Sequence, residues 1–395
     1  MNSRALCLLL AALPMVAVGP AVAQTATPRA TPPRAVVPQS ATPQSATAQT
    51  AKTPAAKSPA AKSPTAKLQT TTLHLTMPVS ATNPIGENIL AFGREVEKQT
   101  GGAVRIEIHE KAELYEDHEV VSAVSSGGVE MGATPLNQFA YDVPVAGVFL
   151  QPFMFNFNAL VRAAAKPDSE IRKMIDDEIL YWTNARVLWW QPHGSTVIFS
   201  RKVPDADRAA IVDRHVGAPD ESTKDLAKAC GGTPHLVPAA DLYSALEKDS
   251  VQMTMTDIFG VMDRELWRVT DTIVNTRHAP SLFLVVINDK AWEKLSEKHQ
   301  HILSEAAAAA QERMWEHFTQ SEAEAYAFAA KKGIKVREPS AKEVVAWREC
   351  SSPLLESYMD RIGELGPKLF AAYGKLRTDP CCNAAAPGQS QFDLR

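Results

Sequence analysis

The chain has 395 residues and a formal net charge of −4, and 45% of its residues are apolar. All 45 acidic residues follow residue 67, where 34 basic residues leave the region from Leu68 onward with a formal charge of −11. So acidic a region argues against a nucleic-acid partner. Beyond the first residues no run approaches the ~18 apolar residues of a membrane span, so we expect a soluble body of about 310 residues, enough for two domains.

Residues 1–23 have the three parts of a signal peptide. Arg4 supplies the positive end, residues 5–18 the apolar core, and Ala21-Val22-Ala23 the small-residue cleavage site. We therefore expect an exported, periplasmic protein. Residues 24–67 are rich in Pro, Ala and Lys and hold no acid or aromatic residue, which predicts a disordered tether whose positive charge is able to contact an anionic envelope surface. We expect a second disordered segment in the tail, residues 381–395.

Strands and helices alternate from Thr72 onward, as in an α/β protein with a mostly parallel sheet. The pattern predicts a first set at 72–77 (strand), 85–99 (helix), 104–109 (strand), 117–126 (helix) and 129–133 (strand). A helix at 169–182 and a strand at 186–191 follow. A second set comprises strands at 196–200, near Val216, at 271–276 and at 282–288, and helices at 221–230 and 239–248. Two such sets predict two lobes with a ligand cleft between them.

The longest expected helix covers residues 289–332, which contain no Gly or Pro. Apolar residues recur there at steps of three and four, and Gly333 is placed to end the helix. At about 1.5 Å per residue it would be roughly 65 Å long, longer than one domain is wide. We favour a helix that crosses both lobes, with a coiled coil or a plain surface helix as alternatives.

The expected order divides the chain into discontinuous lobes. Lobe I would comprise residues 68–194 and 282–310, and lobe II residues 195–281 and 311–380. After the long helix we expect a strand at 334–337 and helical structure at 341–373, interrupted by Pro353 and Pro367.

Enzyme signatures are missing. The chain has no Gly-x-Ser-x-Gly, His-Glu-x-x-His, Cys-x-x-Cys or phosphate-loop motif, so we expect no enzyme activity, no cofactor and no metal site. His299 and His301 lie two apart on a helix and point about 200° apart, which makes a poor metal pair. The run Asp176 to Glu178 is interpreted as a solvated helix face.

Four cysteines follow the signal segment: Cys230, Cys350, Cys381 and Cys382. Their spacing has no metal pattern. An oxidising compartment permits a bridge between Cys230 and Cys350, although the sequence does not give their distance.

Candidate ligand contacts come from the loops at strand ends, where open α/β sheets bind ligands. By position they are Asn83, Asn137, Trp190, Ser195, Thr196, Pro219, Asp220, Thr256 and Asp257. For Trp190, and for Thr256 and Asp257, a purely structural role is the alternative. Trp189 and Trp190 occupy successive strand positions, so one should face the core and the other outward, and either can be structural. Thr256 and Asp257 can instead cap a helix through Trp267.

Seven motifs in order give residues 72–340 a resemblance to a known family, the DctP-type solute-binding proteins of tripartite ATP-independent periplasmic (TRAP) transporters. They are Asn83-Pro84-Ile85-Gly86, residues 87–108, residues 113–119, Gly128-Val129-Glu130-Met131, residues 149–153, residues 231–246, and the helix start at Asn288, Trp292, Leu295 and Gln300. The resemblance implies a two-lobed, hinge-closing protein that delivers a small solute to a membrane permease driven by an ion gradient. Alternative functions are a ligand sensor for a membrane receptor and, with less support, a periplasmic hydrolase.

One departure from that family concerns solute charge. Many of its members hold a carboxylate with an Arg two residues before a proline, and that position is Gly217 here. A second frequent Arg position falls on Ser195 or Thr196. We therefore expect a solute that is neutral, cationic or held in a metal chelate, recognised by hydroxyls, amides and the face of Trp190. Arg214 and Arg201 remain alternative carboxylate-binding residues if the alignment slips.

Overall fold

A computed structural model describes residues 70–203 and 209–383. The expected signal peptide and tether lie outside the described residues, as does the tail beyond residue 383. Within the described residues, the last helix is α12 (Pro380–Asn383). It includes the first residues of the tail, where disorder was expected.

The strands agree closely with the sequence prediction at both ends of the chain. They are β1 (Thr71–Thr76), β2 (Val104–His109), β3 (Met131–Pro135), β4 (Ala185–Ser200), β5 (His215–Ala218), β6 (Thr233–Leu236), β7 (Met253–Asp257), β8 (Thr272–Val274), β9 (Pro280–Asn288) and β10 (Lys335–Arg337). Two of them, β6 and β7, were not predicted. The two expected strands at 186–191 and 196–200 are one continuous strand, β4.

Helices connect these strands. The α-helices are α1 (Pro84–Gln99), α2 (Val120–Ser126), α3 (Asn158–Ala164), α4 (Glu170–Thr183), α5 (Glu221–Ala229), α6 (Leu242–Glu247), α7 (Gly260–Asp263), α8 (Asp289–Glu293), α9 (Glu297–Lys331), α10 (Ala341–Ile362) and α11 (Gly366–Thr378). Short 3-10 turns are η1 (Asp117–Glu119), η2 (Leu136–Phe139), η3 (Pro144–Leu150), η4 (Ala209–Ile211), η5 (Ala239–Asp241), η6 (Leu266–Arg268) and η7 (Gly363–Leu365). Among the described helices none is long and apolar enough to cross a membrane.

One sheet runs through the protein in the order β2-β1-β3-β9-β4-β7-β5-β6, and β8 pairs with β4 and β10. Its flanks are parallel, whereas β9 pairs antiparallel with β3 and β4, and β4 pairs antiparallel with β7. The sheet is thus less parallel than expected, because β4 and β9 run in opposite directions through its centre. We call β1–β3 with α1 and α2 the first section, and β5–β8 with α5–α7 the second section.

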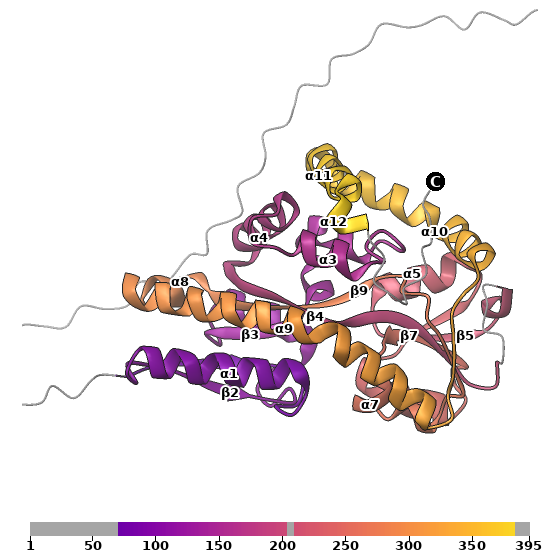
Figure 1. Cartoon of the computed structure of the whole chain (residues 1–395), viewed down its shortest axis with the longest axis horizontal. Coiled ribbons are helices and arrows are strands. Elements are labelled where there is room, and N and C mark those ends of the chain that lie inside the picture. Colours follow the sequence, from indigo (N-terminus) through magenta and orange to yellow (C-terminus); the bar gives the residue numbers. More distant parts are fainter. Residues whose placement is uncertain (1–69, 204–208, 384–395) are drawn as a thin grey trace, which may run out of the picture. The chain divides into compact units, whose positions relative to one another are not determined.

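The strand β4 belongs to both sections, since its first half pairs with β9 and its second half with β7 and β8. The helix α9 also joins them. It packs along α1 and β4 and reaches α7 and β10 (Figure 1). The predicted class, an α/β two-lobed binding-protein fold with a long helix crossing both lobes, is confirmed. The residue boundaries of the two lobes stay a prediction.

The expected helix at 289–332 is broken near its start. Its first turn and a half forms α8, and α9 begins again after Ser296, whose hydroxyl accepts a hydrogen bond from the backbone N–H of His299 at 3.3 Å. An N-cap serine satisfies a terminal N–H and so favours a new helix start over continuation. The remaining 35 residues of α9 still span roughly 52 Å at 1.5 Å per residue. The helix ends at Lys331, and Gly333, the predicted stop, follows two residues later with a φ of +87°.

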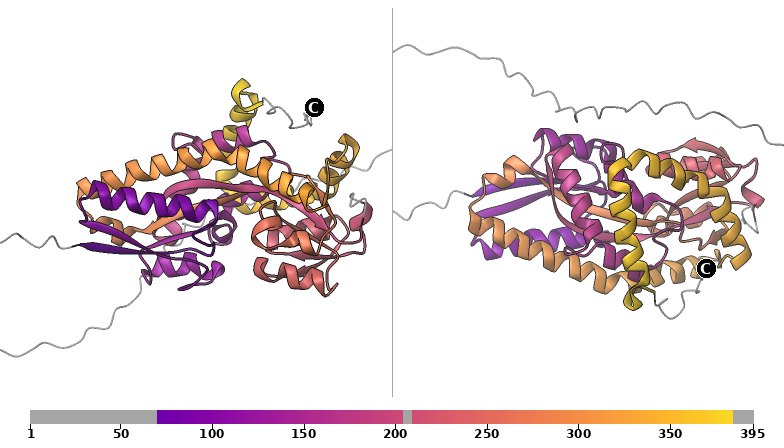
Figure 2. Two further views of the ribbon diagram at one scale, coloured as in Figure 1. Left: turned by 60° about the horizontal axis from the view of Figure 1, so that its bottom comes forward. Right: turned by 90° about the horizontal axis from the view of Figure 1, so that it is seen from above.

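Both faces of the sheet are covered in the first section. Trp189 packs on Phe92 of α1 with ring centroids 4.6 Å apart, and Trp190 packs on Phe149 at 5.3 Å on the opposite face. Both tryptophans are fully buried, so the expectation that one would face outward is wrong. The reason is that η3 and α4 cover this second face, where Phe149 and Asp176 contact Trp190, and α11 packs on α3 and α4 as a further helical layer (Figure 2).

A disulfide joins the second section to α10. Cys230 follows α5 and Cys350 lies in α10, with their Cα atoms 5.0 Å apart. The bridge that the sequence permitted is therefore present. Pro353 lies inside α10 without ending it, so the expected interruption at that position is wrong.

Candidate functional site

A cavity of about 1000 Å³ is lined by residues from both sections of the sheet. Its size is at the upper end of the roughly 300–1,000 Å³ that is usual for small-molecule sites. Seven of the nine predicted contact residues line it: Asn83, Asn137, Thr196, Pro219, Asp220, Thr256 and Asp257. Six of them follow or end strands, and the strands of the two sections run toward each other, so their carboxyl ends meet at the cavity; Thr196 lies within β4, opposite Asp257.

Two predicted contacts do not line the cavity. Ser195 is buried in β4, where its carbonyl oxygen accepts the backbone N–H of Ile258 at 3.2 Å. Trp190 is fully buried, and its indole N–H donates to Asp176 at 2.8 Å. Its ring face is covered by core side chains, so the expectation that it contacts a solute is corrected.

The hydrogen bond from Trp190 to Asp176 also shows that Asp176 is not part of a solvated helix face, so that interpretation is corrected. Its carboxylate also accepts a hydrogen bond from Arg172 at 2.9 Å, and the Arg172 side chain is only 6% exposed. Arg172 in turn donates to Gln311 of α9 at 2.6 Å. This polar network fixes α4 against β4 and α9 and is structural.

Two hydrogen bonds cross the cavity from the first section to the second. The Asn137 amide donates to Asp220 at 2.9 Å, and the Asn83 amide donates to Asp263 at 2.6 Å. Two of these four residues are also helix caps: Asn83 caps the start of α1, and Asp220 caps the start of α5. Asn83 accepts the backbone N–H of Ile85 at 2.9 Å, and Asp220 accepts that of Thr223 at 2.8 Å. Capping holds these polar side chains at the cavity wall.

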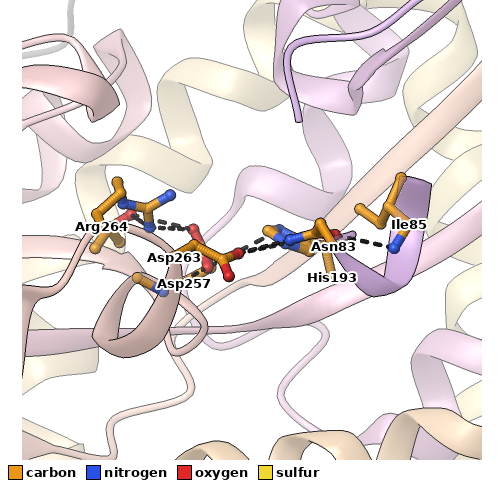
Figure 3. A network of polar contacts seen from close by, with 8 residues as sticks. Asn83, Ile85, His193, Asp257, Asp263 and Arg264 are labelled. Carbon is orange, nitrogen blue, oxygen red and sulfur yellow. Dashed lines mark hydrogen bonds and ion pairs between the residues drawn. The ribbon is translucent and has the colours of Figure 1, made fainter. Parts of the chain in front are cut away.

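His193 lies at the centre of a polar network between these sections (Figure 3). Its ring nitrogens are 3.9 Å from Asp257 and 4.0 Å from Asp263. Its ring stacks on Phe259 with centroids 5.3 Å apart, and its side chain is 6% exposed. Both ring nitrogens lack a hydrogen-bond partner among the described residues, so they offer two buried polar groups to the cavity.

Arg264 is the single arginine among the described residues that line the cavity. Its Nη2 donates to Asp257 at 2.6 Å and to Thr256 at 3.0 Å. The other carboxylate oxygen of Asp257 accepts the backbone N–H of Gly260 at 3.2 Å. The guanidinium is thus engaged by a protein carboxylate. Asp257 also contacts the first residue of α7, whereas the hydroxyl of Thr256 accepts from Arg264 and the N-cap of that helix is Phe259, so the capping alternative that the sequence left open holds only in part.

Burial changes the ionisation of several lining acids. It raises the pKa of Asp117, although the side chains of Thr134 and Gln138 donate hydrogen bonds to the carboxylate and oppose the rise. Burial likewise raises the pKa of Asp263. At Asp257 burial also acts upward, but Arg264 and its other neighbours outweigh it and hold the pKa below its ordinary value.

The lining side chains are acidic overall. Five carboxyl groups face the cavity, against two fixed cations: Glu116, Asp117, Asp220, Asp257 and Asp263 against Lys111 and Arg264. Because Arg264 is paired with Asp257, Lys111 alone remains to balance the other four. The geometry provides hydrogen-bond acceptors and negative charge, with amides of Asn83 and Asn137 as donors.

Neither of the alternative arginines, Arg201 and Arg214, lines the cavity, and nor does Gly217, whereas Thr196 does. Gly217 lies in β5, where its carbonyl oxygen accepts the hydroxyl of Thr254 at 2.8 Å. The guanidinium of Arg201 donates to the carbonyl oxygens of Leu246 and Glu247 at the end of α6. Arg214 is exposed and is absent from the cavity wall.

Sequence reasoning missed His193, Asp263 and Arg264. His193 lies in β4, between the two strands expected at 186–191 and 196–200, and its neighbours Pro192 and Gly194 were the available signal. Asp263 and Arg264 close an otherwise apolar run from Ile258 to Met262. The available signal was this position: two charged residues at the end of an apolar helical turn that starts directly after Asp257.

The chain resembles a family of known proteins in sequence and fold. Residues 75–361 match the family model described as bacterial extracellular solute-binding protein, family 7 (DctP). The sialic acid-binding periplasmic protein SiaP of Vibrio cholerae is 21% identical over 296 residues, which cover 74% of this chain and 90% of that protein. The C4-dicarboxylate-binding periplasmic protein DctP of Rhodobacter capsulatus is 24% identical over 295 residues, 72% of this chain and 85% of that one.

Solved structures show the same fold. A TRAP periplasmic solute-binding protein from Haemophilus influenzae with bound L-gulonate superimposes with a TM-score of 0.72 at 23% identity, covering 77% of this chain and 99% of that one. The family model covers well over half of the chain, and the fold agrees with it. The chain therefore belongs to the DctP family of bacterial extracellular solute-binding proteins, which serve TRAP transporters.

Proposed function

We propose that this protein binds an uncharged or cationic small organic solute in the cavity described above and delivers it to a TRAP-type membrane permease from the periplasm. The signal segment and the periplasmic names of the relatives support the location. The contacts we assign to the solute are those that line the cavity: Asn83, Asn137, Thr196, Pro219, Asp220, Thr256 and Asp257. We add His193 and Asp263 to this set.

The acidic lining carries the proposal about charge. The relatives named above bind sialic acid, a C4-dicarboxylate and L-gulonate, all of them acids. Among the described lining residues, four carboxyl groups face the cavity beyond the Asp257–Arg264 pair, and Lys111 is the one fixed cation left to oppose them. A carboxylate that leaves water without a paired cation costs several kcal/mol even after relaxation, on the order of 3–5. A cation or a hydroxyl-rich solute meets acceptors instead.

Closure would occur where β4 and β9 pass between the sections. Their pairing shifts register between Pro192 and Ser195, and Gly194 has a φ of +86° that other residues rarely adopt. Irregular pairing supports a hinge because fewer ladder hydrogen bonds must bend. The bonds from Asn83 to Asp263 and from Asn137 to Asp220 would be exchanged for contacts with the solute, or shortened around it.

A panel of charge-matched probes tests the proposal. Thermal unfolding is measured with a quaternary amine, a polyol, a neutral amino acid, a C4-dicarboxylate and a keto acid. We expect a cation or a neutral polar probe to raise the melting temperature most. Asp220→Asn should reduce the affinity for a cationic probe about tenfold, the effect of 1.4 kcal/mol, because Asn keeps one oxygen for the helix cap but removes the charge, together with the oxygen that accepts the Asn137 amide.

The matched control is Asp142→Asn, since Asp142 is exposed and does not line the cavity. A dicarboxylate or keto acid as the best probe would refute the charge proposal while leaving solute binding intact. Turnover of an ester or phosphate probe would instead favour the hydrolase alternative. A membrane receptor gene in place of permease genes beside this one would favour the sensor alternative.

A further inference from the structure

A second polar cluster lies at the edge of the sheet, outside the cavity. His74 is on β1, and Glu107 and His109 are on β2, the edge strand. Each of the three offers one ligand atom, and these atoms lie within 4.8 Å of one another. Among the described residues this is the one such group of three or more His, Cys, Asp or Glu. None of its members lines the cavity.

The parallel register of two strands brings these side chains together. His74 pairs with Glu107, and His109 follows Glu107 by two positions on the same strand. Side chains two apart in a strand lie on one face, so Glu107 and His109 flank His74. The alternate positions, Leu73 and Ile106, are buried in the core on the other face. The same alternation that builds the core therefore gathers the polar side chains.

We propose that His74, Glu107 and His109 bind a divalent transition-metal ion, with zinc as the best fit. The Nδ1 of His74 and the Nε2 of His109 are 3.1 Å apart. Two imidazole nitrogens bound tetrahedrally at about 2.0–2.1 Å from zinc are about 3.4 Å apart, so the pair already has almost the spacing of one edge of the tetrahedron. Glu107 is exposed and close enough to supply the third ligand by a change of rotamer. Water fills the fourth position.

A carboxylate behind one histidine strengthens the assignment. The second ring nitrogen of His109 lies 3.6 Å from the carboxylate of Glu113. Metal-bound histidines commonly direct their other nitrogen to a carboxylate, which orients the ring and makes it a stronger ligand. Glu130 accepts the backbone N–H of His74 at 3.0 Å and so holds β1 at this point.

The ligand set favours zinc over the hard cations. Calcium and magnesium take oxygen ligands, whereas imidazole suits zinc, copper and nickel, and two His with one carboxylate and a water is an established zinc set. An ion here would join β1 to the edge strand β2. The site lies away from the cavity, so the proposal is independent of solute identity.

The chain contains its own control for the histidine pair. His215 on β5 and His235 on β6 are also a cross-strand pair, with Nδ1 and Nε2 2.6 Å apart. Neither belongs to a group of three ligands among the described residues. If any close pair of histidines were sufficient, both sites would bind zinc equally. If the carboxylate is required, only the first site should bind tightly.

Zinc titration of the untagged protein, stripped with a chelator, tests the proposal. Calorimetry should show one ion per chain at the tight site. At a zinc concentration about 100-fold above the dissociation constant, the melting temperature should rise by about 5 °C. His109→Gln should weaken binding by at least tenfold, Glu107→Gln by several-fold, and His235→Gln should leave the tight site unchanged. Cobalt in place of zinc should give the visible absorption of a tetrahedral site, lost in His109→Gln.

Binding should weaken as the pH is lowered from 7.5 to 5.5, because protons compete for both imidazoles. Absence of zinc binding to the wild-type protein overturns the proposal. So does an affinity unchanged in both His109→Gln and Glu107→Gln, or a tight site lost in His235→Gln. Since Glu107 is exposed, Glu107→Gln folds without difficulty and keeps the test decisive if His109→Gln does not fold.

Discussion

Replacing Arg264 distinguishes a structural ion pair from a clamp for an anionic solute. The Arg264 and Asp257 side chains are 18% and 11% exposed and lie 2.6 Å apart. Removing one member of such a buried pair leaves an uncompensated charge and typically costs about 3–5 kcal/mol. Arg264→Met should therefore lower the free energy of unfolding by about 3 kcal/mol, because the largest effect that opposes burial and keeps the pKa of Asp257 low is then lost.

Urea unfolding of three variants measures this. The double variant Asp257→Asn with Arg264→Met should recover most of the loss, because no buried charge remains. Arg268→Met is the matched control. Its partner Glu265 lies 3.0 Å away, but both side chains are about half exposed, so this change should cost less than about 1 kcal/mol. If Arg264→Met kept full stability but lost solute binding, Arg264 would be the clamp and our reasoning about solute charge would fail.

Three further predictions concern stability and the bonds across the cavity. Cys350→Ser opens a disulfide that spans 120 residues, so the free energy of unfolding should fall by about 3–5 kcal/mol. A reductant should lower the melting temperature of the wild-type protein but not that of the variant. Equal melting temperatures of the oxidised wild-type protein and the variant would contradict this. Burial lowers the pKa of His278 to about 4 from its ordinary 6.5, so the unfolded chain takes up a proton that the folded one does not, and acidification from pH 6.5 to 4 should remove about 3 kcal/mol of stability. His278→Gln should lack this increment in urea unfolding at the two pH values, and an identical pH dependence would exclude His278 as its source. Asn83→Ala and Asn83→Ser both remove the amide that donates to Asp263, but Ser keeps the cap of α1, so Asn83→Ala should cost about 1 kcal/mol more than Asn83→Ser; equal stability of the two variants would show that the cap contributes nothing.

Local signals in the sequence predicted much of the fold. Asn83 and Pro84 mark the start of α1 as an N-cap followed by a first-turn proline, and the structure has both. Where the prediction failed, a weaker local signal competed with a stronger pattern. Ser296 begins α9, yet the uninterrupted apolar period around it favoured one longer helix. Residues of β7 are buried on both sides and show no alternation, so no period identified them.

The site was predictable where its residues end strands. Asn137 and Asp220 were identified by that position alone, and the structure joins them by a hydrogen bond. Burial on the two sheet faces is a property of packing, so the sequence did not show that Trp190 lies under α4 and Phe149. The contact of His193 with Asp257 and Asp263 depends on the pairing of β4 with β7, which adjacent residues do not reveal.

Small-angle X-ray scattering with and without the best-binding probe tests the central claim most directly. If the two sections close around a solute in the cavity, the radius of gyration should decrease at saturation, and Asp142→Asn should behave like the wild-type protein. Asp220→Asn should need a higher concentration of a cationic probe to reach the same decrease. Identical scattering profiles at saturating probe would contradict solute binding by closure.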